Sequence, residues 1–313
     1  MIIAGIDTSN YTTSLALIDG DGKLLANIKA PLPVAPGERG LRQSDAVFAH
    51  IKNIPTVMKA AEEVLAGEKI SVIGVSERPR NIDGSYMPCF LVGADVAKSI
   101  STLSGIPLYS FSHQCGHIMA GIYSSGRLDL LEKEFCAFHV SGGTTEMLKV
   151  RYQGGGFSTE LIGGTEDLNA GQLIDRVGVH LGLPFPCGAH LERLALGNLA
   201  RVPKRKVSIK DFRINLSGIE NIAKRLYSDT ADAALVAAFV LEHIGDALTL
   251  LSEKYEEKYG KGEFLYAGGV MSNSIIKEKL KGAFSASFAE PALSADNGVG
   301  IAYLAYLAHK RSF

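Results

Sequence analysis

The chain repeats one pattern of strands at half-chain spacing. An apolar run at residues 2–7 leads into a small polar turn at residues 8–13, and a second apolar run follows at residues 14–19. The same order of strand, small polar turn and strand returns at residues 135–150. A pattern that recurs in each half indicates two duplicated domains, and helical segments between the strands favour an α/β fold.

Composition limits what such a pair of domains can bind. The 313 residues are 46% hydrophobic and 21% charged, an ordinary globular balance that can bury two cores. The net charge of −1 excludes a global field that would attract nucleic acid, so a nucleic-acid partner needs a local basic patch. The densest basic run is residues 201–213, with Arg201, Lys204, Arg205, Lys206, Lys210 and Arg213. It is either a contact for RNA phosphates or an ordinary solvated loop.

The N-terminus and the cysteines favour a cytoplasmic protein. Residues 1–7 have no basic segment followed by a long apolar stretch, so they are typical of a strand and not of a signal peptide. No run of about 18 apolar residues is evident, and we expect no membrane span. The cysteines stand far apart without a C-x-x-C pair, which favours reduced thiols: Cys89, Cys115, Cys136 and Cys187.

Local signals predict further elements along the chain. Prolines and glycines at residues 30–43 predict a loop. Ser44 or Asp45 can cap a helix that runs to about residue 53, and Pro55 fits the first turn of a second helix. In the second half, residues 231–259 carry apolar side chains at helical spacing, which predicts a long buried helix.

Two histidines four residues apart are the first candidates for a chemical site. In a helix, His113 and His117 share one face and could hold a divalent metal between two neutral imidazoles. Metalloproteases with this spacing place a glutamate general base directly after the first histidine. Gln114 stands there and cannot take a proton, so the pair is not equipped for zincin hydrolysis. The alternative is that both histidines are ordinary surface or core residues.

Three small polar or glycine-rich turns follow strands in the two halves. They are residues 8–13, residues 141–145 and residues 268–273. Backbone N–H groups in such turns form anion-binding nests, and glycine lets a phosphate approach closely. Each turn alone is consistent with a simple hairpin connection, but the three in this order favour the actin-like nucleotide-binding architecture of sugar kinases and chaperone ATPases. We expect an N-terminal domain of residues 1–129 plus 296–313, a C-terminal domain of residues 130–295, and a central cleft.

Five motifs resemble those of the TsaD/Gcp family in order and spacing, over nearly the whole chain. They are Val140-Ser141-Gly142-Gly143-Thr144, Asn169-Ala170-Gly171-Gln172-Leu173-Ile174-Asp175-Arg176, Leu216-Ser217-Gly218, Ala267-Gly268-Gly269-Val270-Met271-Ser272-Asn273 and Ala295-Asp296-Asn297-Gly298. The histidine pair stands where the family has its H-x-x-x-H. The family, once described as glycoproteases (peptidase family M22), is understood as the tRNA threonylcarbamoyladenosine transferases. The resemblance implies two actin-like (ASKHA, ribonuclease H-like) ATPase domains.

The resemblance also implies a metal site and a nucleotide site. The metal ligands and catalytic residues would be His113, His117 and Asp296, with one Fe²⁺ or Zn²⁺ per chain. The residues that bind the adenine nucleotide part of the substrate would be Val140, Ser141, Gly142, Gly143, Thr144, Asp175, Gly188 and Asn273. Family members transfer a threonylcarbamoyl group from threonylcarbamoyl-AMP to the adenosine next to the tRNA anticodon, and AMP leaves. The implied partners are tRNA and proteins that resemble the family's TsaB and TsaE.

The chain departs from the family pattern on the phosphate side. Thr144 and Glu146 stand where the family has His and Gln, Arg176 replaces a Lys, and Asn10 lies where an acidic element is usual. These changes leave open a transferase of the same chemistry with a different acceptor, or a non-catalytic nucleotide-binding partner subunit. A sugar kinase is a further alternative, with Asp7 as its catalytic base, but it gives the histidine pair no role.

Overall fold

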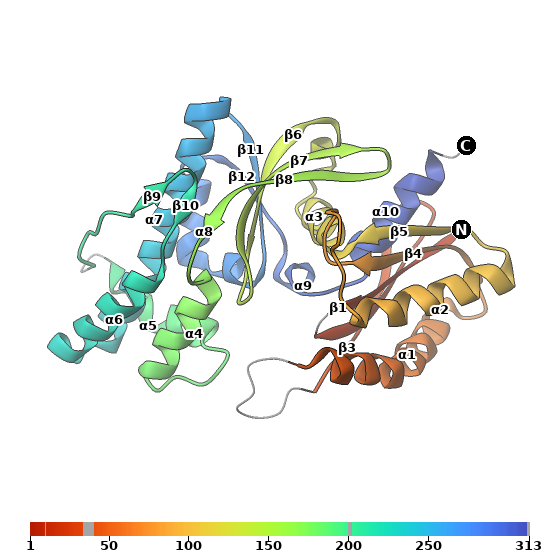
Figure 1. Cartoon of the computed structure of the whole chain (residues 1–313), viewed down its shortest axis with the longest axis horizontal. Helices are drawn as coiled ribbons and strands as arrows, with labels where there is room; N and C mark the ends of the chain where they lie inside the picture. The colour runs from red at the N-terminus through yellow and green to blue at the C-terminus, as the bar shows by residue number, and fades with distance from the viewer. Residues whose placement is uncertain (10, 34–40, 200–201, 312–313) are drawn as a thin grey trace. The chain divides into compact units, whose positions relative to one another are not determined.

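The computed structural model describes residues 1–9, 11–33, 41–199 and 202–311. The departure at Asn10, residues 34–40 of the predicted loop, and Arg201 of the basic run lie outside the described residues. The chain forms two compact units (Figure 1). The first unit comprises Met1–Leu128, Tyr152–Ser158 and Ala292–Phe313, and the second comprises Asp129–Arg151 and Thr159–Pro291.

The first unit is built on a five-stranded sheet with the strand order β3-β2-β1-β4-β5. The strands are β1 (Ile2–Ser9), β2 (Thr12–Ile18), β3 (Leu24–Pro31), β4 (Ile70–Arg78) and β5 (Leu108–Ser112). β1, β2 and β3 form an antiparallel meander, whereas β4 and β5 run parallel to β1. The helices of this unit are α1 (Gln43–Leu65), α2 (Cys89–Ser104), α3 (His113–Ser124), α9 (Pro291–Ser294) and α10 (Val299–Lys310), with α9 at its boundary.

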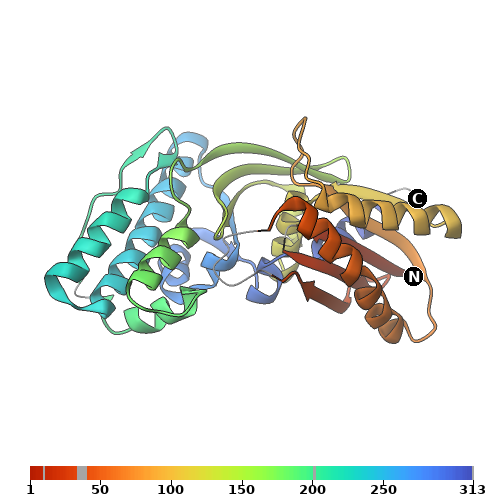
Figure 2. The same ribbon diagram turned by 60° about the horizontal axis from the view of Figure 1, so that its bottom comes forward.

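Helices cover both faces of this sheet, which explains why β1 is buried along its whole length (Figure 2). Ile2, Ala4 and Ile6 pack in one core with residues of α1 and α2. Gly5 points to the opposite face, where a Cβ would collide with the backbone of α10 at Ala302. This close approach seats the start of α10 against β1 and fixes the residues that precede it.

The second unit has a seven-stranded sheet with the order β12-β11-β6-β7-β8-β10-β9. The strands are β6 (Glu134–Val140), β7 (Thr145–Gln153), β8 (Gly156–Thr165), β9 (Ile209–Lys210), β10 (Arg213–Ile214), β11 (Glu263–Ala267) and β12 (Ser285–Phe288). The helical elements are η1 (Leu128–Glu132), α4 (Ala170–His180), α5 (Gly188–Ala195), α6 (Ser217–Thr230), α7 (Ala233–Tyr259), η3 (Gly269–Ser272) and α8 (Ser274–Lys281). The order β8-β7-β6-β11-β12 repeats the order of the first sheet, so the predicted duplication is confirmed.

The two units differ from the expected domains at residue 129 and at residues 152–158 and 292–295. Residue 129 belongs to the second unit, whereas the other two segments, expected in the second domain, belong to the first unit. Residues 152–158 form the tip of the β7–β8 hairpin, and Asn81 Nδ2 donates to Phe157 O at 3.0 Å. Tertiary packing of a hairpin tip leaves no local signal in the sequence.

Helix α1 corrects the prediction of two helices. It continues through Pro55 without a break. The missing N–H of Pro55 leaves the carbonyl of Ile51 without its helical donor, but Ile51 lies on an exposed turn where water can reach it. Buried residues at helical spacing on either side, among them His50 and Val57, hold both halves against the sheet.

Helix α7 is the central helix of the second unit. It has 27 residues and a mean hydropathy of 1.7 in its most apolar window, so by length and composition it could cross a membrane, contrary to the prediction that no such segment exists. That window is 72% buried, and Phe239, Ile244 and Leu248 pack in the core of the unit. The predicted long buried helix is therefore confirmed.

Candidate metal centre and nucleotide loops

Two elements of the first unit carry the metal-ligand candidates. Helix α3 begins at His113, and Ser112 caps it by accepting a hydrogen bond from Cys115 N at 3.3 Å. Asp296 lies in the short segment between α9 and α10. The side chain of Asn297 braces this segment, because Nδ2 donates to Ala295 O at 2.7 Å and Oδ1 accepts from Val299 N at 3.0 Å.

The three side chains lie together. Asp296 Oδ1 is 3.5 Å from His113 Nε2 and 3.4 Å from His117 Nε2, and the candidate ligand atoms all lie within 4.8 Å of one another. The side chains of His113, His117 and Asp296 are 20%, 9% and 22% exposed, so the cluster is sheltered yet reachable from solvent. Two imidazoles and one carboxylate are a donor set that suits zinc or ferrous iron and leaves a coordination position open. The residues therefore fit the metal that the resemblance implies.

A buried carboxylate fixes the first of these ligands. Asp7 is fully buried at the end of β1, and its Oδ1 accepts from His113 Nδ1 at 3.0 Å. Ser9 Oγ donates to Asp7 Oδ2 at 2.6 Å, and Ser76 Oγ donates to Asp7 Oδ1. A histidine that donates one ring nitrogen to a carboxylate presents the other nitrogen to a metal in a fixed orientation. From the sequence alone Asp7 was a candidate only for a kinase base, and its contact with His113 was not predicted.

The same contacts set the pKa values of His113 and Asp7. Burial disfavours the imidazolium of His113, but the charge and hydrogen bond of Asp7, with the charge of Asp296, outweigh it and raise the pKa of His113 to about 9. Burial also opposes the ionised form of Asp7, yet His113 and Ser76 lower the pKa of this carboxyl below its usual value. Without metal, the imidazole of His113 therefore holds a proton between the carboxylates of Asp7 and Asp296.

We expect metal binding to release this proton. A metal needs the lone pair of His113 Nε2, and a pKa of about 9 keeps the metal-free imidazole protonated at pH 7. Metal affinity should therefore rise about tenfold per pH unit up to about pH 9 and then level off. Zinc titrations by calorimetry in two buffers of different ionisation enthalpy should count close to one proton released at pH 7. Release of no proton would contradict the raised pKa of His113.

The second unit brings the phosphate-loop candidates together at the ends of parallel strands. The loop of residues 141–144 follows β6, and Gly171 N donates to Ser141 O at 3.2 Å. A Cβ at Gly171 would lie 2.6 Å from Gly142 N, whereas Gly142 and Gly143 themselves face open space. The loop thus rests on the start of α4 and leaves its glycines accessible.

The remaining nucleotide-site candidates make backbone contacts elsewhere in the second unit. The Asp175 carboxylate accepts from Cys187 N at 2.9 Å, which ties α4 to the residue before Gly188 at the start of α5. Burial raises the pKa of Asp175, and the hydrogen bond from Cys187 opposes that rise. Asn273 Oδ1 accepts from Ile276 N at 3.1 Å and so caps α8. The side chains of Asp175 and Asn273 therefore hold backbone segments of the second unit in place.

Gly268 gives a direct test of this arrangement. It has φ +101°, and a Cβ there would collide with Val140 O at the end of β6. Gly268→Ala should lower the free energy of unfolding by roughly 1–3 kcal/mol or more, because the loop after β6 must shift. The neighbouring Gly269→Ala is the matched control, since a Cβ there meets nothing within 4 Å and should change stability by about 0.5 kcal/mol at most. Urea unfolding of the two variants makes the comparison, and equal stabilities would contradict the packing of Gly268.

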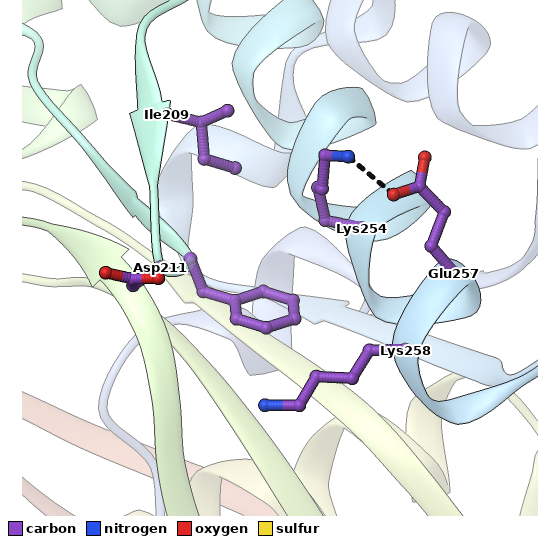
Figure 3. Close-up of a pocket in the computed structure, with 6 residues that line it drawn as sticks. Ile209, Asp211, Lys254, Glu257 and Lys258 are labelled. Carbon is purple, nitrogen blue, oxygen red and sulfur yellow. Dashed lines mark hydrogen bonds and ion pairs between the residues drawn. The ribbon is translucent and has the colours of Figure 1, made fainter.

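The basic run contributes to an aromatic contact that was not predicted from the sequence. Phe212 stacks on Tyr259 of α7 with ring centroids 6.3 Å apart, and the Lys258 ammonium lies 5.3 Å from the Phe212 ring. Figure 3 shows Lys258 beside the β9–β10 hairpin and the ion pair of Lys254 with Glu257. Stacked rings among lysines offer both features by which single-stranded RNA is bound.

Comparison with solved structures defines the class of fold. The (R)-2-hydroxyglutaryl-CoA dehydratase component A of Acidaminococcus fermentans superimposes with a TM-score of 0.56 at 14% identity, covering 100% of both chains. A ROK family glucokinase of Streptomyces griseus, in complex with glucose and AMPPNP, gives 0.53 at 13% identity, with 99% of this chain and 100% of that chain covered. Likeness at such identity shows the fold alone, and the fold is that of the actin-like ATPases, as predicted.

Sequence comparison identifies the family within this class. The family model of TsaD, described as tRNA N6-adenosine threonylcarbamoyltransferase, matches residues 24–303. Proteins of that name from Bacillus licheniformis and Methanopyrus kandleri are 28% and 27% identical to this chain. The alignments cover 91% and 99% of this chain and 83% and 88% of the relatives. The chain belongs to the TsaD family, and the resemblance noted in the sequence is confirmed.

Proposed function

We propose that the protein transfers a threonylcarbamoyl group from threonylcarbamoyl-AMP to the exocyclic amine of the adenosine next to the tRNA anticodon. The observation that carries the proposal is the cluster of His113, His117 and Asp296, set on Asp7, in a chain of the TsaD family. In the reaction, the adenosine N6 forms a bond to the carbamoyl carbon, the bond from that carbon to the phosphate oxygen breaks, and AMP leaves while N6 loses a proton.

The residues of the first unit would hold one divalent ion, Fe²⁺ or Zn²⁺. When bound, such an ion supplies Lewis-acid polarisation of a carbonyl and a fixed point for substrate oxygen atoms. Asp7 keeps His113 Nδ1 protonated and directs His113 Nε2 toward the ligand position. Gln114 cannot act as the general base of a zincin, so we propose that this site does not hydrolyse peptides.

The second unit would bind the nucleotide part of the donor. The exposed glycines of the loop 141–144 leave backbone N–H groups available to a phosphate, and Asp175 and Asn273 keep the neighbouring helix ends in place. The backbone N–H dipoles of this loop would then stabilise the negative charge of AMP as it leaves. Among the predicted nucleotide-site residues, Gly142 and Gly143 would contact the phosphate. Asp175 would act indirectly, by holding the backbone at Cys187 in place.

The proposal extends to partners and location. We propose that exposed lysines of the basic run, with Phe212 and Tyr259, contact the tRNA backbone and bases. The transferase would act in the cytoplasm with proteins that resemble TsaB and TsaE, as the family resemblance implies. Binding of tRNA should then weaken as salt rises, and less steeply after Lys210→Gln, whereas an unchanged salt dependence would argue for a solvated loop.

The deciding experiment supplies purified zinc- or iron-loaded protein, its TsaB- and TsaE-like partners, threonylcarbamoyl-AMP and an unmodified tRNA. Nucleoside mass spectrometry should detect N6-threonylcarbamoyladenosine in this tRNA and none in a matched tRNA with guanosine at the acceptor position. Consumption of the donor without any modified nucleoside would favour the alternative of a different acceptor, to which the changes at Thr144 and Glu146 point. No consumption of the donor would favour a non-catalytic subunit.

A further inference from the structure

Lys29 lies in a polar row that crosses the sheet of the first unit. On β3 it is directly opposite Ser14 of β2, and Ser14 is directly opposite Asp7 of β1. Residues opposite one another in neighbouring strands point to the same face of a sheet. That face is the one on which Asp7 holds His113, and Ser14 Oγ closes the row by donating to Asp7 O at 3.3 Å.

The ammonium of Lys29 reaches the segment that carries a metal ligand. Its Nζ donates to Ala292 O at 3.0 Å, four residues before Asp296. Among the residues that the structure describes, this is the one hydrogen bond of that ammonium, which has three N–H donors. Burial lowers the pKa of Lys29, while the charge of Asp296 opposes that fall, so the amine lies within electrostatic range of the candidate metal ligands.

The charges around the candidate metal ligands indicate what kind of ligand Lys29 would bind. The carboxylates of Asp7 and Asp296 would balance a divalent ion held with two neutral imidazoles. The ammonium of Lys29 then gives the loaded site a net positive charge. A half-buried positive site with free N–H donors favours an anionic ligand, because a charged hydrogen bond is strong where water is partly excluded.

We propose that Lys29 binds an anionic group of the acyl donor beside the metal ligands. The inference rests on the proposed function for the identity of the donor. Threonylcarbamoyl-AMP carries two such groups, the carboxylate of its threonyl part and its phosphate, and both present the oxygen atoms that an ammonium recognises. Lys29 is thereby a substrate-binding residue of the first unit that no motif in the sequence marks.

The competing role for Lys29 is purely structural, as a clamp on Ala292. Two substitutions separate the roles. Lys29→Gln removes the positive charge but keeps an N–H donor, on a side chain one bond shorter, that can approach Ala292 O, whereas Lys29→Met removes both charge and donor. A clamp predicts that Gln behaves like the natural residue and that Met loosens the segment before Asp296 and weakens the metal. Anion binding predicts that Gln and Met both lose the ligand and that Gln keeps the metal.

The test is calorimetry on the zinc-loaded full-length protein with three probes: N-carbamoyl-L-threonine, its methyl ester and AMP. Lys29→Gln should weaken binding of N-carbamoyl-L-threonine or of AMP by roughly 10- to 100-fold, and the anion affected identifies the group that Lys29 holds. Affinity for the neutral ester and for zinc should not change. Lys23→Gln, an exposed lysine at the β2–β3 turn, is the matched control and should change none of these.

The proposal is overturned if Lys29→Gln leaves both anions unaffected, if it weakens the ester as much as the acid, or if the natural protein binds neither anion. Failure of the proposed function is a separate result. A Lys29-dependent affinity for an anion in a protein that never modifies tRNA would retain this site and reject the transferase. Transfer to tRNA at normal affinity by Lys29→Gln would reject this site and retain the transferase.

Discussion

Asp296→Ala should reduce transfer of the threonylcarbamoyl group by on the order of a thousandfold. The substitution removes the carboxylate that lies 3.5 Å or less from both histidine Nε2 atoms, so two imidazoles alone remain to hold the metal. Loss of the proposed Lewis-acid stabilisation would raise the activation free energy by several kcal/mol. Each 1.36 kcal/mol is about a tenfold change in rate. The measurement is single-turnover modification of tRNA at saturating donor.

The matched control for this variant is Asp95→Ala, which removes an exposed carboxylate from α2. Asp95→Ala should change the free energy of unfolding by about 0.5 kcal/mol at most, and Asp296→Ala should still unfold in one cooperative urea transition. A metal-free Asp296→Ala protein that transfers at the normal rate would eliminate the metal-dependent mechanism.

Asp7→Asn should lower metal affinity by about 10- to 100-fold although Asp7 is not expected to touch the metal. The carboxylate accepts from His113, Ser9 and Ser76. An amide keeps the size but places an N–H₂ group where donors converge, so His113 loses its fixed orientation. Zinc competition with a chromophoric chelator at about pH 9.5 measures the change, because above the raised pKa of His113 protons no longer compete with the metal in either protein.

A control carboxylate in the second unit separates metal tuning from general loss of stability. Asp167 accepts from Leu216 N at 2.8 Å and from Ser217 at the start of α6, in a network of comparable size. Asp167→Asn should lower the free energy of unfolding by about 1–3 kcal/mol and leave zinc affinity unchanged. If Asp7→Asn changes stability but not zinc affinity, Asp7 has no positioning role toward the metal.

Much of this architecture could be predicted from local patterns. The strand, polar turn and strand units of both halves are found, and their sheets share one strand order. The histidine pair falls on the first turns of α3 because a strand ends at Ser112, whose side chain caps the helix. Such features depend on a few neighbouring residues, which is why spacing alone predicts them.

Features that depend on packing between distant segments were missed. The role of Asp7 requires that β1 and β4 pair with Asp7 beside Ser76 and that α3 returns to the same edge. The continuity of α1 through Pro55 depends on a sheet that holds both halves of the helix. The stacking of Phe212 on Tyr259 joins residues far apart in the chain. No short window of sequence contains these relations.

Helix α7 shows a case in which the sequence pattern fits two different structures. Its composition would suit a membrane, yet most of the apolar window is buried within the second unit. Burial in a core and burial in a lipid bilayer select the same residue types, so composition alone cannot separate them. The contacts of Phe239 and Leu248 with the other core residues provide the distinction.

The most direct test of the metal centre is the metal content of the purified protein by elemental analysis, comparing the natural chain with His113→Ala after anaerobic preparation. We expect close to one equivalent of iron or zinc in the natural protein and almost none in the variant, with both chains folded. Absence of metal from both, or equal metal in both, would contradict the assignment of His113, His117 and Asp296 as the metal ligands.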